Sequence, residues 1–190
     1  MSKNILFIHG FASVGQGLKS LQLQQMFDGQ VLAPDLVHRP LQDVQTLSQL
    51  VAQHQIKTVI GSSLGGFYAL LLALKYPINL ILINPALQSP VTLQKYIGTV
   101  QRSDGQTFEW SEQQIAELSI LLQNILLENL QKLDKSSVLV LLATRDEVLD
   151  YRIAAQLLQG ANILLDEKAD HRFADLQPYA SLLQQWHQRP

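Results

Sequence analysis

Short apolar runs alternate with longer stretches of helical periodicity along most of the chain. Brief runs of Ile, Val and Leu bounded by turn-forming residues are typical of buried strands, whereas leucines spaced three and four residues apart are typical of helices. This pattern predicts strands over residues 5–8, 30–33, 58–60, 80–83, 138–142 and 162–165. It predicts helices over residues 18–27, 44–54, 64–76, 151–158 and 179–187.

The regular alternation of strands and helices indicates the fold class. A strand–helix–strand unit places two parallel strands in one sheet with the helix packed against a face. We therefore expect an α/β domain with a six-stranded, mostly parallel sheet and helices on both faces. In such sheets the ligand crevice lies beyond the carboxyl ends of the strands, so the residues that follow each strand are the first candidates for chemistry.

One segment, residues 87–135, interrupts the alternation. It contains no convincing strand, a polar middle over residues 101–106, and a helical pattern over residues 111–133. Ser111 followed three residues later by Gln114 is a capping box that favours a helix start at this point. Because the segment follows a strand at the crevice end of the sheet, we interpret it as a lid insertion. The alternative is an ordinary crossover helix with a long surface loop.

Length and charge limit the function classes. The 190 residues, 47% of them hydrophobic, suffice for one domain around one core, so residues 1–190 are expected to form a single domain. With 14 Lys and Arg against 16 Asp and Glu, the net charge is −2, and the basic residues form no stripe. These features argue against nucleic acid or an anionic membrane surface as a partner.

Cysteine and histidine usage narrows the chemistry further. The chain has no cysteine, so it has no disulfide, thiolate metal site or cysteine nucleophile, which suits a reducing compartment. Its five histidines are dispersed and form no metal-ligand pair, and we expect neither a metal nor another cofactor. The first residues resemble no signal peptide and no apolar run approaches ~20 residues, so we expect a cytoplasmic protein without a membrane span.

The most informative motif is Gly-Ser-Ser-Leu-Gly-Gly at residues 61–66. It places Ser63 in a G-x-S-x-G frame between an expected strand and an expected helix, the context of a nucleophile elbow. In the alternative interpretation Ser62 or Ser63 only caps the following helix. A phosphate-binding loop is disfavoured because Phe67 and Tyr68 stand where Lys and Ser or Thr are required.

The first expected strand leads into His9-Gly10-Phe11. Acyl transfer creates a tetrahedral oxyanion, and preorganised backbone N–H groups stabilise it. Gly10 permits a suitable turn, and we expect the N–H groups of Phe11 and Leu64 to form the oxyanion hole. For His9 we favour a structural role, in which its imidazole holds the loop by hydrogen bonding.

A candidate acid follows the expected strand 138–142. A serine nucleophile needs a histidine base, and that base needs a carboxylate to hold its tautomer. We expect Asp146 to be this carboxylate, Glu147 to point elsewhere and Asp150 to cap the next helix. The alternative is that Asp146 is a surface charge paired with Arg145 or Arg152.

The candidate base is His171, in the loop after the last expected strand. A lone loop histidine is usually a solvated side chain, and His38, His54 and His187 compete for the role. None of these three lies in the loop directly after the last expected strand, however. The chain order Ser, Asp, His is that of α/β-hydrolases rather than of chymotrypsin or subtilisin.

Five segments taken together carry a family resemblance over nearly the whole chain: His9-Gly10-Phe11, residues 61–69, Asn84-Pro85-Ala86, residues 146–152 and His171-Arg172-Phe173. With these the chain resembles the α/β-hydrolase superfamily and, more narrowly, the small bacterial YqiA-type esterase family. Two segments depart from the usual pattern. Arg145 precedes the acid where such proteins often carry glycine, and Ala169-Asp170 precede the base where small residues or Asn are more usual.

The resemblance implies a minimal α/β-hydrolase fold with strand order 2-1-3-4-5-6 and right-handed crossovers. It implies Ser63 as nucleophile, Asp146 as acid, His171 as base, and Phe11 and Leu64 as oxyanion donors. The expected reaction is hydrolysis of a small-molecule carboxylic ester or acyl thioester through an acyl-enzyme. An acyltransferase with the same triad and a non-catalytic binding or scaffold protein on the same fold are the alternatives.

Overall fold

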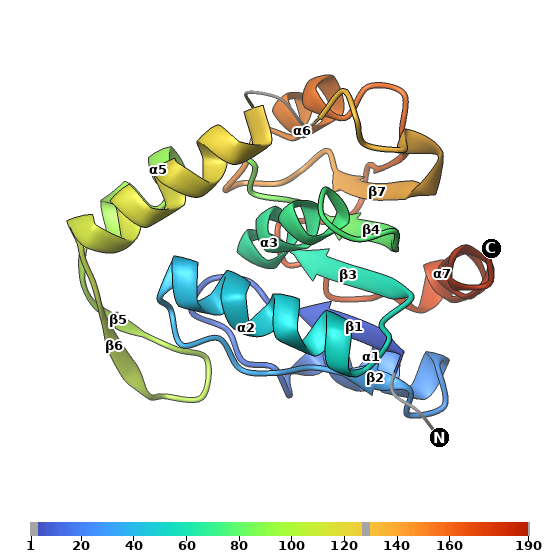
Figure 1. Cartoon of the computed structure of the whole chain (residues 1–190), viewed down its shortest axis with the longest axis horizontal. Coiled ribbons are helices and arrows are strands. Elements are labelled where there is room, and N and C mark those ends of the chain that lie inside the picture. The colour runs from blue at the N-terminus through green and yellow to red at the C-terminus, as the bar shows by residue number, and fades with distance from the viewer. Residues whose placement is uncertain (1–3, 127–129, 190) are drawn as a thin grey trace.

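The computed structural model describes residues 4–126 and 130–189. A six-stranded parallel sheet forms the centre of the molecule, with strand order β2-β1-β3-β4-β7-β8 (Figure 1). In chain order these six strands run 2-1-3-4-5-6, so the predicted fold class and order are confirmed. The strands are β1 (Ile5–Ile8), β2 (Val31–Leu32), β3 (Thr58–Ser62), β4 (Asn79–Ile83), β7 (Val138–Ala143) and β8 (Asn162–Asp166).

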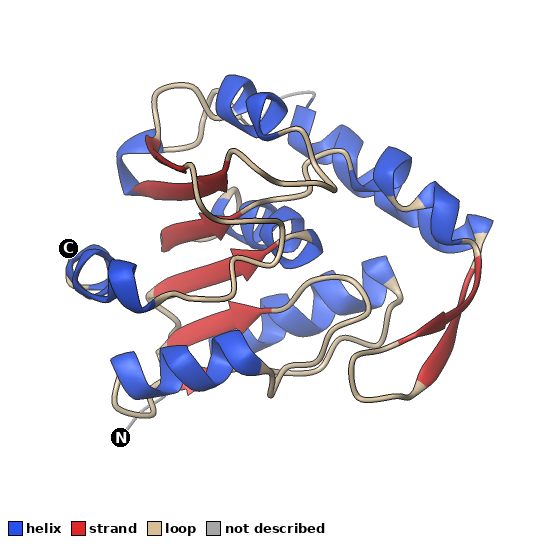
Figure 2. Ribbon diagram, turned by 180° about the vertical axis from the view of Figure 1, so that it is seen from behind, coloured by secondary structure: helices blue, strands red, loops and turns tan. Residues whose placement is uncertain are grey.

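Helices cover both faces of this sheet. One hydrophobic core joins α2, α3, α5 and α6 to one face, and a second joins α1 and α7 to the other. Figure 1 shows α2 and α3 in front of the sheet, and Figure 2 shows the C-terminal helix from the opposite side. The helices are α1 (Leu18–Met26), α2 (Pro40–Gln53), α3 (Leu64–Ala73), α4 (Ser89–Thr92), α5 (Glu112–Leu126), α6 (Tyr151–Leu157) and α7 (Ala180–His187), with short 3-10 turns at Gln94–Tyr96, Lys135–Ser137 and Gln177–Tyr179.

The burial of the central strands follows from this double cover. Every residue of β1, β3, β4 and β7 is buried. A parallel sheet covered on both faces needs continuous apolar runs rather than alternation, and such runs made these strands predictable. Parallel pairing also brings the carboxyl ends of β1, β3, β4, β7 and β8 to one edge of the sheet.

The inserted segment corrects one expectation, because it contains two strands where the pattern indicated none. β5 (Gly98–Gln101) and β6 (Thr107–Trp110) form a separate antiparallel hairpin around the polar turn at residues 102–106. Each strand has only four residues and exposes alternate side chains, so neither produces a continuous apolar run. The hairpin extends from α5 past the end of α2 (Figure 1).

The helix of the insertion is shorter than expected. The described part of α5 ends at Leu126, residues 127–129 lie outside the described part of the chain, and residues 130–132 form a turn rather than helix. Its predicted start is confirmed, because the amide N–H of Ser111 donates to the side chain of Gln114 at 2.9 Å. α5 packs against α2, α3 and α4. Within the described ranges no helix is long and apolar enough to cross a membrane. That the insertion acts as a lid stays a prediction.

Candidate active site

Ser63 lies in the sharp turn between β3 and α3. Ser62 is the last residue of β3 and pairs with Ile83 of β4, so Ser63 is the first residue beyond the ladder. Its backbone has φ 54° and ψ −120°, a strained conformation for a residue with a side chain. A Cβ atom at Gly61 would overlap the carbonyl oxygen of Gly65, and one at Gly65 would overlap that of Ile8. The glycines therefore allow strand and helix to approach as a nucleophile elbow requires.

The capping alternative for Ser63 is not supported. Ser63 occupies the N-cap position of α3, but its side chain makes no capping hydrogen bond. Its backbone is held instead: the N–H donates to Ile83 at 3.0 Å, and the carbonyl accepts from Gly66 at 2.9 Å and from Ala86 at 3.0 Å. Ser62, in contrast, is buried, with 5% of its surface exposed. The hydroxyl presented at the turn is that of Ser63.

Gly10 brings the loop after β1 against this serine. A Cβ atom built on Gly10 would lie 3.2 Å from the Ser63 Cβ and 3.7 Å from the Ser63 Oγ. Phe11, one predicted oxyanion donor, is the next residue. Leu64, the other, is the first residue of α3, and an N–H in the first turn of a helix has no acceptor within that helix. One predicted donor therefore follows the glycine that packs on Ser63, and the other follows Ser63 itself in the chain.

The acid and base candidates lie in contact although they are separated by 25 residues in the chain. Nδ1 of His171 is 2.8 Å from Oδ2 of Asp146. The Asp146 side chain is 1% exposed, whereas that of His171 is 18% exposed. The other carboxylate oxygen of Asp146 accepts the N–H groups of Val148 and Leu149, both at 2.8 Å. Asp146 is thus fixed on both oxygens, and His171 keeps contact with solvent.

The environment keeps Asp146 ionised. Burial acts to raise its pKa, but the hydrogen bond with His171 and the N–H groups of Leu149 and Val148 outweigh it, and the pKa lies below its ordinary value. An ionised Asp146 accepts an N–H from Nδ1 of the His171 ring, and the tautomer assigned in this way leaves the Nε2 lone pair free of that contact. This is the geometry expected of a general base and its orienting acid.

The two departures from the usual pattern leave this pair intact. The Arg145 side chain is exposed. The Asp170 carboxylate accepts the N–H of Phe173 at 3.2 Å, within its own loop. Arg152 pairs with Asp150 at 2.8 Å rather than with Asp146. Asp150 also accepts the Arg152 N–H and so caps α6, as predicted.

Glu147 is closer to the site than expected. It does not point elsewhere, because its carboxylate accepts the backbone N–H of His171 at 3.1 Å. Consecutive residues after β7 therefore hold His171, with Asp146 on its ring and Glu147 on its backbone.

Asn84 is a residue whose role the sequence did not reveal. It follows β4, is 2% exposed and has a positive φ of 42°. Its Oδ1 accepts the N–H of Ala143 at 2.8 Å, and its Nδ2 donates to the carbonyls of Asp170 at 3.1 Å and His171 at 3.2 Å. One amide thereby joins the end of β7 to the histidine loop. The available signal was a polar residue directly after a buried strand, in the Asn-Pro-Ala segment.

Three of the other histidines, His9, His38 and His187, make structural contacts. The His9 ring bonds to the Gly10 carbonyl through Nδ1 at 2.8 Å and accepts the Leu36 N–H at Nε2 at 3.0 Å, which confirms its predicted role in holding the loop. The His187 ring contacts Thr58, at the opposite end of the sheet. His38 is buried and stacks on Phe108 of β6, with ring centroids 3.8 Å apart.

Cavity size does not point to the catalytic candidates. A cavity of about 670 Å³ is lined by Lys57, Asn79 and Arg189 among others, at the amino ends of β3 and β4. A smaller apolar cavity of about 50 Å³ lies between Pro85 and the Val148-Leu149 turn. We favour the smaller one as part of the site, since the Val148-Leu149 turn that lines it donates both N–H groups to Asp146. It also lies at the strand ends where ligands bind in open α/β sheets. Among residues 4–126 and 130–189, no cluster of three or more potential ligands could hold a metal ion.

Comparison with known proteins supports this fold. A putative hydrolase from Agrobacterium vitis S4 matches with a TM-score of 0.72 at 14% identity, covering 99% of this chain and 90% of that one. A monoacylglycerol lipase from Paleococcus ferrophilus matches at 0.70 and 12%, covering 96% and 93%. Est1E from Butyrivibrio proteoclasticus matches at 0.66 and 14%, covering 96% and 84%. These similarities show an α/β-hydrolase fold.

Sequence relatives define the family. A UPF0227 protein from Serratia proteamaculans is 28% identical over 185 residues, covering 92% of this chain and 93% of that protein. A relative from Yersinia pseudotuberculosis, YpsIP31758_1593, is 26% identical over the same length. The model of the uncharacterised protein family UPF0227 matches residues 4–188, and the chain therefore belongs to this family.

Proposed function

We propose that the protein is a serine hydrolase that cleaves a carboxylic ester or acyl thioester. The observation that carries the proposal is the Asp146–His171 hydrogen bond of 2.8 Å in a fold whose strained elbow presents Ser63. A serine, a histidine base and a carboxylate in this arrangement perform nucleophilic acyl transfer.

In the proposed reaction His171 Nε2 accepts the hydroxyl proton of Ser63 as Oγ attacks the substrate carbonyl. The N–H groups of Phe11 and Leu64 stabilise the oxyanion, and each such donor contributes ~3 kcal/mol in related sites. The intermediate collapses to an acyl-enzyme as protonated His171 gives its proton to the leaving alcohol or thiol. Water then attacks the acyl group with His171 again as base, releasing the acid and restoring Ser63.

Hydrolysis is favoured over transfer to another acceptor by the exposure of the base. The His171 side chain is 18% exposed, so water reaches the group that would activate it. The structural neighbours named as an esterase domain from Rhodothermus marinus and as a monoacylglycerol lipase favour esters as the substrate class. An acyltransferase would need an acyl-enzyme shielded from water.

The test is covalent labelling with a fluorophosphonate probe. We expect the unmutated protein to be labelled at one site, and Ser63→Ala and His171→Ala to lose the labelling. Ser62→Ala is the matched control, since its hydroxyl is on the adjacent, buried residue. Circular dichroism checks that each variant is folded. An unlabelled wild-type protein, or labelling that persists in Ser63→Ala, contradicts the proposed nucleophile.

Activity on p-nitrophenyl esters separates the enzyme from a scaffold protein on the same fold. We expect Ser63→Ala to reduce hydrolysis by at least ~10⁴-fold, because removal of a triad member leaves only the contribution of the oxyanion hole and binding. A chain that takes up the probe but hydrolyses no ester or thioester would favour the acyltransferase alternative.

A further inference from the structure

The turn of the β5–β6 hairpin lies against the loop that follows β1. We name residues 9–16 the oxyanion loop, because they include Phe11. The N–H of Ser103, in the hairpin turn, donates to the Ala12 carbonyl of this loop at 2.9 Å. The two segments are about 90 residues apart in sequence, and only the tertiary fold brings them together.

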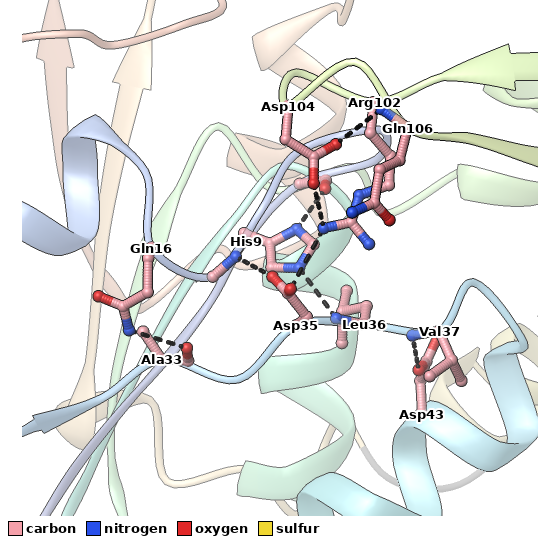
Figure 3. Close-up of polar contacts among 12 residues, drawn as sticks. His9, Gln16, Ala33, Asp35, Leu36, Val37, Asp43, Arg102, Asp104 and Gln106 are labelled. Atoms are coloured by element: carbon pink, nitrogen blue, oxygen red, sulfur yellow. Dashed lines mark hydrogen bonds and ion pairs between the residues drawn. The ribbon is translucent and has the colours of Figure 1, made fainter.

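Arg102 is the main ionic link between hairpin and sheet. Its Nη2 lies 3.2 Å from Oδ2 of Asp35 and 3.1 Å from Oδ2 of Asp104 (Figure 3). The Arg102 side chain is 12% exposed, and its Nε is buried without a partner among the described residues. Asp104 contacts the guanidinium from within the hairpin turn, and Asp35 contacts it from the segment after β2.

Asp35 connects this arginine to the oxyanion loop. While Oδ2 faces Arg102, Oδ1 accepts the N–H of Gly15 at 2.6 Å (Figure 3). The Gly15 N–H is the main cause that lowers the Asp35 pKa below its ordinary value, with Arg102 acting in the same direction against burial. Each oxygen of one carboxylate therefore binds a different segment, the oxyanion loop on one side and the hairpin on the other.

The oxyanion loop needs such support, because part of it is strained. Ala12, directly after the predicted donor Phe11, has a positive φ of 55°. Alanine adopts this conformation only where the surroundings impose it. The Phe11 ring is itself packed by the hairpin, with its centroid 4.9 Å from that of Trp110 and 5.6 Å from that of Phe108.

We propose that Arg102 is a positioning residue for the oxyanion hole, which holds the Phe11 N–H in place through Asp35 and Gly15. The inference rests on the proposed function. Arg102 is not a catalytic residue, because it acts through the loop and touches no reacting atom. The 56% exposure of Asp35 means that the ion pair adds little to folding stability, so its effect belongs in the rate.

The test compares three variants in steady-state ester hydrolysis. Misplacement of a catalytic donor by a fraction of an ångström is costly, so we expect Arg102→Gln to lower kcat about tenfold with KM within about twofold. Arg102→Lys keeps the charge and should recover part of the loss. Asp35→Asn should lower kcat similarly, and the double variant should be no worse than either single variant, since the residues act as one link.

Arg152→Gln is the matched control. It removes an exposed ion pair with Asp150 by the same substitution, outside the hairpin and the oxyanion loop. We expect its kcat and melting temperature to equal those of the unmutated protein. Arg102→Gln should also keep the melting temperature, and fluorophosphonate should still label Ser63 completely, at a slower rate.

The outcomes separate the two proposals. Unchanged kcat in Arg102→Gln, or a fall in kcat that only follows the loss of folded protein, overturns the positioning role while the hydrolase stands. A tenfold loss that Arg102→Lys does not recover at all also contradicts it, since charge is then not the property used. An unmutated protein that neither takes up the probe nor hydrolyses esters overturns the proposed function and this inference with it.

Discussion

The parallel sheet and the β5–β6 hairpin differ in how their strands are built. Every residue of β4 is buried, and its apolar run is legible in the sequence. Apart from the buried Trp110, the hairpin strands alternate between half-buried and exposed residues around a polar turn. The sheet carries Ser63, Asp146 and His171 on the loops at its carboxyl edge, whereas the hairpin supports the oxyanion loop from outside. The site therefore combines a rigid, predictable framework with a small inserted support that pattern analysis missed.

The largest expected difference between the two regions concerns their glycines. A Cβ atom at Gly65 would overlap backbone atoms of β1, which cannot move aside within the sheet. We expect Gly65→Ala to destabilise the fold by more than ~4 kcal/mol, or to prevent folding. At Gly105, in the hairpin turn, φ is +87° but no atom lies within 4 Å, so Gly105→Ala should cost only ~1 kcal/mol of conformational strain.

Chemical denaturation measures both variants against the unmutated protein. Similar losses of unfolding free energy in Gly65→Ala and Gly105→Ala would contradict the contrast between a packed sheet and an open hairpin turn.

Removal of the Asn84 side chain tests the part of the site that the parallel sheet holds. Asn84→Ala removes the acceptor of the buried Ala143 N–H and the donor that holds the Asp170 and His171 carbonyls. Leaving such groups unpaired costs ~1–3 kcal/mol. We expect a loss of ~3 kcal/mol in unfolding free energy and a fall in kcat of ~10²-fold, because the histidine loop shifts. Arg102→Gln, on the hairpin side, should affect the rate alone.

Unfolding free energy and ester hydrolysis are measured on the same preparations. Asn162→Ala is the control, since its side chain donates one long hydrogen bond of 3.4 Å at the amino end of β8. A normal kcat in folded Asn84→Ala would show that the base does not depend on this amide.

The smallest expected effect is on the pH dependence of folding stability. It begins with His38, which stacks on Phe108 of the hairpin. Burial between Phe108 and the neighbouring loops lowers the pKa of His38 to about 4, with His9 and Arg102 acting in the same direction and Asp35 opposing them. Between pH 4 and the ordinary value of 6.5, the unfolded chain binds a proton that the folded chain excludes. The stability contributed by His38 is therefore complete above pH 6.5 and lost as the pH falls toward 4.

The contribution of Asp43 in α2 to stability changes with pH in the opposite direction. Burial raises its pKa to about 6, against the N–H of Val37, and Glu117 adds to the rise. Its stability contribution is complete below its ordinary pKa of 3.8 and is lost as the pH rises through 6. The two groups partly cancel between about pH 4 and 6.

Removing each group separates the two effects. Between about pH 4 and 6, we expect the unfolding free energy of Asp43→Asn to rise by ~2 kcal/mol more than that of the unmutated protein. The unfolding free energy of His38→Asn should instead fall as the pH rises over the same range. Asparagine suits the positive φ of 59° at His38. Identical pH profiles for the two variants and the unmutated protein would show that neither group shifts its pKa on folding.

The sequence predicted the sheet well because its strands are continuous apolar runs between turns. The strand over residues 5–8 agrees with β1, and the main errors elsewhere in the sheet are of one or two residues at strand ends. The errors outside the sheet, in α2 and in the hairpin, have local causes. α2 begins at Pro40, four residues before the expected start, because proline suits the first turn of a helix. The hairpin was missed because four-residue strands with exposed alternate positions resemble loops.

At the site, residue types and their places after strands were enough to bring Ser63, Asp146 and His171 forward as candidates. The roles of these three, and of Phe11 and Leu64 as donors, stay predictions. The sequence pattern could not predict contacts between residues that are distant in the chain. Asn84 joins β7 to the histidine loop, and Glu147 binds the His171 backbone. Nothing in the sequence indicates which partner either side chain contacts.

The sequence by itself determined the α/β alternation and the elbow at Ser63, because these depend on local periodicity and on the few residues that fit a strained turn. The strand order was what the family resemblance implied. The tertiary structure alone decided the contact of Asp146 with His171, the bridge of Asn84 and the docking of the hairpin on the oxyanion loop. Those contacts join segments from about 25 to 90 residues apart, and their geometry exists only once the sheet has aligned its carboxyl ends.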